Sequence, residues 1–146
     1  MLRHELVEPA QRNVVDLPVV KAHLRVNHDG EDGLIQMYLD AATAALDGPT
    51  GILGLALGPQ TWRAVFQPHE DIVLPLGPVM SQEAPVASED EVSVTYVAGF
   101  PNGIPTPIRA AILLHVATLY QNREQSADGW TPTRAYEQLL APWRRW

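Results

Sequence analysis

The chain has 146 residues, a net charge of −7, 13 prolines and no cysteine. This length suits one domain with a core of its own, and the absence of cysteine excludes disulfides and thiolate metal sites. The negative charge and the single lysine argue against a protein that holds duplex DNA through its phosphates. No apolar run approaches the roughly 20 residues of a membrane span, so we expect a protein without a membrane segment.

The N-terminal third of the chain predicts an extended arm followed by two helices. Residues 1–15 show no clear periodicity and predict the arm. Asp16 is a typical N-cap, and residues 17–26 place their apolar side chains on one face of a short helix. A second helix is predicted from about Glu31 to the Gly48-Pro49 pair. Residues 16–47 therefore predict a helical hairpin.

Residues 48–105 differ from the flanking segments because they are rich in glycine and proline and lack a helical stripe. Alternating apolar residues predict strands over 61–66 and 92–97, and residues 71–76 are a candidate third strand. Residues 78–90 predict a loop, since they hold two prolines and three acids. Strands this short cannot fold alone, so we expect them to pack on the helices.

The last part of the chain predicts two further helices. Thr106 and Pro107 begin a helix over 106–124 that is apolar nearly all round and therefore central. A short helix begins near residues 131–133 and ends before Pro142, within a C-terminal segment of residues 131–146. The predicted fold is mainly α, with a minor β part: a bundle of three to four helices with a small β-hairpin inserted between the second and third.

The C-terminal end combines apolar, aromatic and basic residues: Leu139, Leu140, Trp143, Arg144, Arg145 and Trp146. Tryptophan and arginine are enriched where one protein anchors in another. Residues 109–146 are also net basic, with five basic and three acidic residues. The end predicts an anchor for a partner. Alternatively, both tryptophans cover the chain's own core, or Leu139, Leu140 and Trp143 pack internally while the remaining residues project outward.

No motif in the chain predicts catalysis. The five histidines lack metal-ligand spacing, and there is no GxSxG, P-loop or GxGxxG pattern. We therefore predict a protein that is not an enzyme and has no catalytic residues, metal or cofactor. Two alternatives stay open: a nucleic-acid-binding accessory protein with a helix-turn-helix at 17–47, and a small hydrolase with a cryptic histidine site. The second helix counts against the former, because it carries four acids and no basic residue.

Several blocks of sequence resemble the small head-tail connector (adaptor) proteins of long-tailed bacteriophages and gene transfer agents. They are LPVVKAHLRVNHDGED at 17–32, residues 41–51 with the following QTW at 60–62, VTYVAGF at 94–100, IPTPIRAAILLHVATLYQNRE at 104–124 and LLAPWRRW at 139–146. These blocks span most of the chain in the family order. Many relatives carry a longer β-hairpin where residues 77–91 stand, so the resemblance says least about that stretch.

The resemblance implies a virion structural protein, with residues 1–146 forming a single connector domain. Such a protein would assemble in the host bacterial cytoplasm, as a ring of twelve copies beneath the portal protein that continues the DNA channel toward the tail. DNA would pass through without sequence-specific binding. The C-terminal residues named above would face the portal, while mid-chain loops would contact the next ring toward the tail, a stopper or tail terminator. Four acids are expected to face the channel or that next ring: Glu83, Glu89, Asp90 and Glu91.

Overall fold

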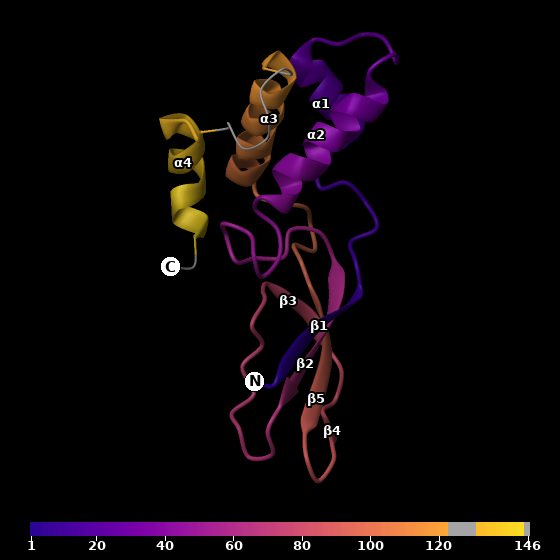
Figure 1. Cartoon of the computed structure of the whole chain (residues 1–146), viewed down its shortest axis with the longest axis vertical. Coiled ribbons are helices and arrows are strands. Elements are labelled where there is room, and N and C mark those ends of the chain that lie inside the picture. Colours follow the sequence, from indigo (N-terminus) through magenta and orange to yellow (C-terminus); the bar gives the residue numbers. More distant parts are fainter. Residues whose placement is uncertain (123–130, 145–146) are drawn as a thin grey trace.

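The computed structural model describes residues 1–122 and 131–144. In chain order the elements are β1 (Arg3–Glu8), α1 (Leu17–Leu24), α2 (Asp32–Ala44), β2 (Gln60–Phe66), β3 (Val79–Gln82), β4 (Val86–Ala87), β5 (Val92–Ala98), α3 (Thr106–Gln121), α4 (Arg134–Leu140) and the 3₁₀ turn η2 (Ala141–Trp143). The molecule is elongated, with the helices gathered at one end and the strands at the other (Figure 1). We call these two ends the helical half and the sheet half.

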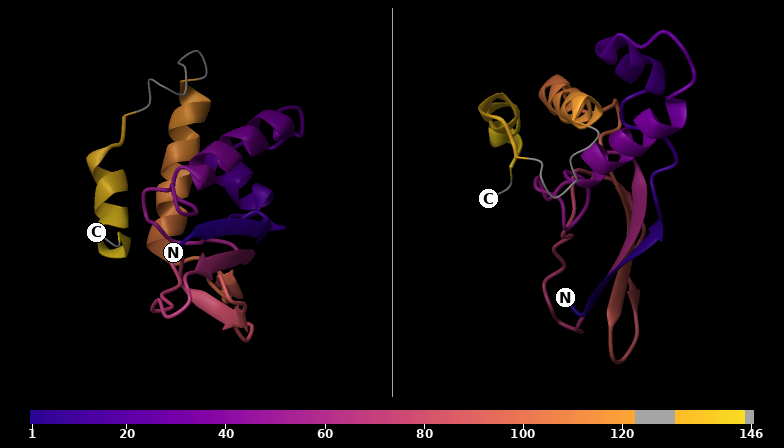
Figure 2. Two further views of the ribbon diagram at one scale, coloured as in Figure 1. Left: turned by 60° about the horizontal axis from the view of Figure 1, so that its bottom comes forward. Right: turned by 45° about the horizontal axis from the view of Figure 1, so that its top comes forward.

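The helical half is organised around α3, which contacts α1, α2 and α4. Figure 2 shows α3 between α4 on one side and the α1–α2 pair on the other. The helices begin where the sequence predicts: Asp16 precedes α1, and the Thr133 hydroxyl caps α4 by accepting a bond from the Tyr136 amide at 3.2 Å. Their apolar faces form the main core, which includes Ile35, Leu39, Ile108, Ile112, Val116 and Leu140.

The sheet half is a five-stranded antiparallel sheet with the order β1-β2-β5-β3, and β4 pairs with the outer part of β5. One face of this sheet carries a second, smaller core built from alternating residues of β2 and β5. The buried members are Ala56, Ala64, Phe66, Leu76, Val94, Tyr96 and Ala98. Leu76 and the partly buried Leu74 come from residues 67–78, so this connection covers that face and leaves the other one open.

The two halves are joined by chain segments that bond to one another. Ala56 belongs to the smaller core and its neighbour Leu57 to the main core. The amide of Phe100 donates to the Leu57 carbonyl at 3.2 Å, and the amide of Ala56 donates to the Gly77 carbonyl at 2.8 Å. Gly99 has a φ of 147°, and a Cβ there would lie 2.7 Å from the backbone nitrogen of Pro59. Only glycine allows the two backbones to approach this closely.

The predicted mainly α bundle is wrong, because the chain forms an α+β fold with a five-stranded sheet. The predicted arm at 1–15 contains the edge strand β1, and the predicted loop at 78–90 contains β3 and β4. Residues 71–76 form no strand, and of these only Leu74 and Leu76 pack in the smaller core. The strands at 61–66 and 92–97 and all four helices are confirmed.

Candidate interaction surfaces

Half of the predicted C-terminal anchor serves the chain's own core. Leu140 is fully buried in the main core, and Leu139 and Trp143 pack against that core. The indole of Trp143 meets the ring of Phe100 edge to face, with centroids 6.2 Å apart. These three side chains therefore hold α4 and η2 against the rest of the protein, which matches the expectation in which they pack internally.

Arg144 follows Trp143 and is exposed, while Arg145 and Trp146 lie outside the described residues. The exposed guanidinium group stands beside a surface hollow of about 380 Å³. The hollow is lined by Leu55, Gly77, Pro78, Phe100, Pro142, Trp143 and Arg144. Arg144, the last described residue, therefore lies where the helical and sheet halves meet, since Leu55 and Phe100 belong to the segments that join the halves.

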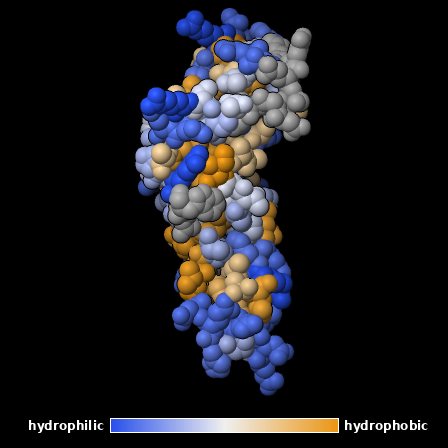
Figure 3. Space-filling model, turned by 60° about the vertical axis from the view of Figure 1, so that its left-hand side comes forward, coloured by the Kyte–Doolittle hydropathy of each residue, from blue (hydrophilic) through white to orange (hydrophobic). Residues whose placement is uncertain are grey.

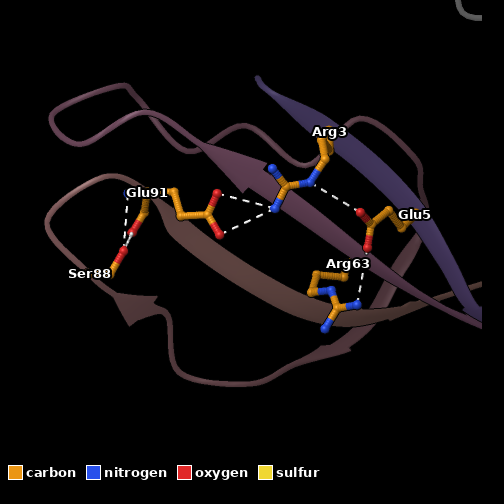
Figure 4. Close-up of polar contacts among 5 residues, drawn as sticks. All are labelled: Arg3, Glu5, Arg63, Ser88 and Glu91. Carbon is orange, nitrogen blue, oxygen red and sulfur yellow. Dashed lines mark hydrogen bonds and ion pairs between the residues drawn. The ribbon is translucent and has the colours of Figure 1, made fainter.

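Three of the four predicted acids lie in the turn between β4 and β5, which is the tip of the hairpin. Glu83 lies farther back, where its amide donates to the carbonyl of Thr95 in the middle of β5 at 2.9 Å. Glu83, Glu89 and Asp90 are exposed. Glu91 differs, because both of its carboxylate oxygens accept bonds from the Arg3 guanidinium at 3.1 and 3.2 Å (Figure 4). Glu89 and Asp90 are therefore surface charges of the tip, Glu83 is a surface charge of the same hairpin, and Glu91 is tied to another strand.

Arg3 is the centre of an ion-pair network on the open face of the sheet. Besides Glu91 it binds Glu5 at 3.1 Å, and Glu5 accepts a second bond from Arg63 at 3.0 Å. The hydrogen bond from Arg63, supported by Arg3, holds the pKa of Glu5 below its usual range. Because Arg3 pairs with Val65 of β2 and reaches Glu91 beside β5, its side chain spans the middle strand. The network fastens the edge strand β1 across the sheet.

The opposite face of β1 is fastened by His4. Its Nε2 atom lies 2.7 Å from the Tyr96 hydroxyl, and its ring stacks on Trp62 with centroids 4.4 Å apart. Burial lowers the pKa of His4 and raises that of Tyr96 to about 12. His4 is therefore a structural residue of the smaller core, and its contacts complete the attachment of β1 on both faces of the sheet.

Two buried titratable groups also have structural roles. Asp47 accepts bonds from the Leu57 amide at 2.8 Å and the Gln60 side chain at 3.2 Å, and burial raises its pKa. His115 stacks edge to face on Tyr136 of α4, and burial lowers its pKa to about 4. Neither group belongs to a candidate metal cluster within residues 1–122 and 131–144. None of the helices in this part of the chain is long and apolar enough to cross a membrane.

The helical hairpin does not present a basic surface to nucleic acid. Lys21, the only lysine of the chain, binds Asp29 at 2.7 Å and Asp32 at 2.8 Å. These two bonds raise the pKa of Lys21 and neutralise its charge locally. A helix-turn-helix reader needs cations that face the phosphates. The structure therefore gives no support to the nucleic-acid-binding alternative.

Exposed large apolar side chains concentrate on the sheet half. Nine of those that the described part of the chain exposes lie there, and two, Val19 and Met37, lie on helices. The nine are Met1, Leu2, Leu6, Val7, Ile72, Val73, Val79, Met80 and Val86. Figure 3 shows apolar residues gathered over this half, above a hydrophilic tip. Apolar patches of this kind mark contact surfaces.

The phage gp6-like head-tail connector protein family matches residues 15–140 of the chain. Because this match covers most of the sequence, the chain belongs to that family. The protein is therefore a structural connector protein of virions. No curated protein matches the chain significantly.

Two solved structures share the fold over almost the whole chain. The first is the neck of an empty GTA particle, computed with C6 symmetry, with a TM-score of 0.74 and 22% identity over 98% of this chain and 95% of that one. The second is the virion of a native gene transfer agent (GTA) particle, with a TM-score of 0.74 and 21% identity over 99% of this chain and 95% of that one. At this identity the likeness establishes the shared fold.

Proposed function

We propose that this protein is a ring-forming subunit of the neck that joins the DNA-filled head of a virion to its tail. The observation that carries this proposal is the family match over residues 15–140, because that family consists of head-tail connectors. The similar neck structure was computed with C6 symmetry, and a ring of twelve copies is compatible with that symmetry. The whole chain would act as one connector domain located in the particle, and its role would be structural rather than catalytic.

The portal-facing anchor is proposed to begin at Arg144. Leu139, Leu140 and Trp143 pack internally, so they support the segment without being free to enter a partner. Arg144, together with Arg145 and Trp146 that follow it in the sequence, carries the charge and aromatic area of an interface anchor. Guanidinium groups pair strongly with carboxylates, and a desolvated anchor of this type is worth about 2 kcal/mol or more. Repetition around a ring turns such contacts into firm attachment.

The hairpin tip is proposed to face the DNA channel or the next ring toward the tail. Glu89 and Asp90 are exposed at this tip and Glu83 is exposed farther along the same hairpin, so their charges remain available to repel the phosphates of passing DNA. Glu91 is left out of this role because Arg3 already neutralises it. An acidic surface would let DNA move through the ring without sequence-specific binding.

The test is to tag the chain in its native host, purify particles and ask whether it co-purifies with the portal protein. A variant lacking Arg144 to Trp146 should fold, because the truncation spares Trp143 and the main core. We expect that variant to be absent from particles. The matched control replaces Arg144 and Arg145 by lysine and keeps Trp146, and it should be retained in part. Absence of the intact chain from particles would refute the proposed function, and normal incorporation of the truncated chain would refute the anchor.

A further inference from the structure

The sheet has two different open edges, and these are the basis of the inference. β1 forms one edge, and β3 with β4 forms the other. A terminal strand leaves backbone amides and carbonyls without a partner in its own sheet, so proteins usually protect such edges with charges or cover them. The number of charged residues at each edge therefore indicates whether that edge is protected from pairing or is able to pair with another strand.

Among the described residues, each edge carries one exposed acid that no basic side chain neutralises, Glu8 at the end of β1 and Glu83 between β3 and β4. β3 and β4 contain no charged residue. β1 contains Arg3, Glu5 and Glu8. Arg3 and Glu5 bind Glu91 and Arg63 in the inner part of the sheet, whereas Glu8 is exposed at the end of β1, beyond the irregularity that follows Leu6. Both edges also expose large apolar side chains: Leu6 and Val7 on β1, and Val79, Met80 and Val86 on β3 and β4.

The strand directions make the two edges complementary. The pairs β1–β2, β2–β5 and β5–β3 are all antiparallel, so β1 and β3 of one sheet run in opposite directions. If the next copy continues the sheet in the same orientation, its β1 lies antiparallel to β3 of the first. Contacts between two different patches, repeated head to tail, are those that close a ring. Pairing of β1 with a second β1 would instead give a two-fold dimer.

We propose that neighbouring copies of this chain join by adding the β1 edge of one sheet to the β3–β4 edge of the next. This inference rests on the proposed ring and names the surface that builds it. The occupant of each edge is a second copy of the same chain, because each chain offers both edges and a ring needs both. The apolar side chains of the two edges would be covered in the assembly, leaving the acidic hairpin tip exposed.

The sheet itself gives the register to test. Leu6, Trp62, Tyr96 and Gln82 form one row across the strands. If neighbouring copies are related by rotation about an axis parallel to the strands, equivalent residues lie at the same level along that axis. Leu6 of one copy would then lie beside Gln82 of the next. Within one subunit these residues are three strand spacings apart, about 14 Å, which is beyond the reach of a disulfide. The chain has no natural cysteine to interfere.

The experiment introduces Leu6→Cys together with Gln82→Cys in the full chain, and in parallel with Met80→Cys or Ala84→Cys to allow a shift of two residues. Particles are purified, oxidised and run on a non-reducing gel. We expect a ladder of disulfide-linked dimers, trimers and larger species from one of these pairs. The matched control, Val19→Cys with Met37→Cys, places equally exposed cysteines on the helical half and should give no ladder.

The outcomes separate this inference from the proposed function. Double variants that enter particles but give no ladder in any register would overturn edge pairing and leave the connector role intact. Dimers formed by Leu6→Cys alone would also overturn it, because they would indicate pairing of β1 with β1. A ladder from the control pair equal to that from the edges would overturn it too, since crowding in the particle would explain both. Absence of the unmodified chain from particles would refute the proposed function itself.

Discussion

The helical half and the sheet half differ in how many of their apolar side chains are buried and how many are exposed. Among the described residues, the main core of the helical half contains fifteen buried apolar side chains and the core of the sheet half contains seven. The exposed large apolar side chains are divided nine to two in favour of the sheet half. Burial therefore stabilises the helices, while the sheet keeps apolar area available for contact. The comparison teaches that most of the buried core lies in the helical half, whereas most of the exposed apolar area lies in the sheet half.

The largest effect is expected from a cavity in the helical half. Ile112 lies on α3 and is fully buried in the main core, so Ile112→Ala should lower the free energy of unfolding by about 2–4 kcal/mol. Val19→Ala, on the exposed surface of α1, should change it by less than about 0.5 kcal/mol. Urea unfolding of both variants measures the difference. Equal losses would mean that the main core does not dominate stability.

The free energy of unfolding should also depend on pH, through a histidine of the helical half. The folded pKa of His115 is about 4, below the ordinary value of 6.5, so its contribution is fully present above pH 6.5 and is lost as the pH falls toward 4. The loss should amount to about 2–3 kcal/mol. His115→Leu should flatten the dependence without removing it, because the pKa of His4 is lowered as well. An unchanged slope in thermal unfolding between pH 7 and 4 would contradict the assignment.

A smaller and local effect is expected in the sheet half. Arg3→Gln removes the ion pairs to Glu5 and Glu91, and such exposed pairs contribute less than about 1 kcal/mol. Faster amide hydrogen exchange in β1, with little change in global unfolding, should reveal the loss. Lys21→Gln removes ion pairs of the helical hairpin and should leave exchange in β1 unchanged. Equally fast exchange in both variants would show that the network does not hold β1.

The smallest effect on stability should come with a large effect on assembly. Val86→Lys puts a charge on an exposed position of β4 and should change the free energy of unfolding by less than about 0.5 kcal/mol. It should nevertheless reduce incorporation into particles, since a charge on an edge strand opposes strand addition. Met37→Lys makes a comparable change on α2 and should be incorporated normally. Loss of both variants from particles would remove the distinction between the halves.

The helices could be predicted from sequence because their signals are local. Asp16 and the Thr133 cap stand at helix starts, and apolar residues at helical spacing mark the buried faces. The strands 61–66 and 92–97 were predictable for the same reason, since both alternate toward the smaller core. Each of these elements carries its pattern within its own sequence and needs no knowledge of a distant partner.

The edge strands could not be predicted because residues distant in the sequence make most of the contacts that hold these strands in place. β1 has a charged face whose residues bind Glu91 and Arg63, far along the chain, so in sequence it resembles a polar arm. β3 and β4 are short and exposed, and the nearby Pro78 and Pro85 indicate a loop. The sheet's extent was underestimated for this reason, and the fold was assigned to the wrong class.

Prediction of the candidate surfaces from the sequence is limited in the same way. The combination of leucine, tryptophan and arginine predicts an anchor in the C-terminal segment, but it does not indicate which of these side chains face inward. Leu140 is buried because α4 turns it toward α3, a direction that depends on packing rather than on composition. In the same way, nothing near Glu91 in the sequence indicates that Arg3 binds it. Glu83, Glu89 and Asp90 are exposed, as their polar sequence context indicates, and the surface that they face stays a prediction.

The segments that join the two halves also define how the molecule carries mechanical load. A pull between the hairpin tip and the helices must pass through residues 9–16, 45–59 and 99–105, which are the chain's crossings between them. The last two are cross-linked by the Phe100–Leu57 backbone bond and pressed together at Gly99 and Pro59. Each of these joining segments would therefore carry part of the tension. We therefore expect the junction to act as a stiff coupling, which would transmit a displacement from one end of the subunit to the other.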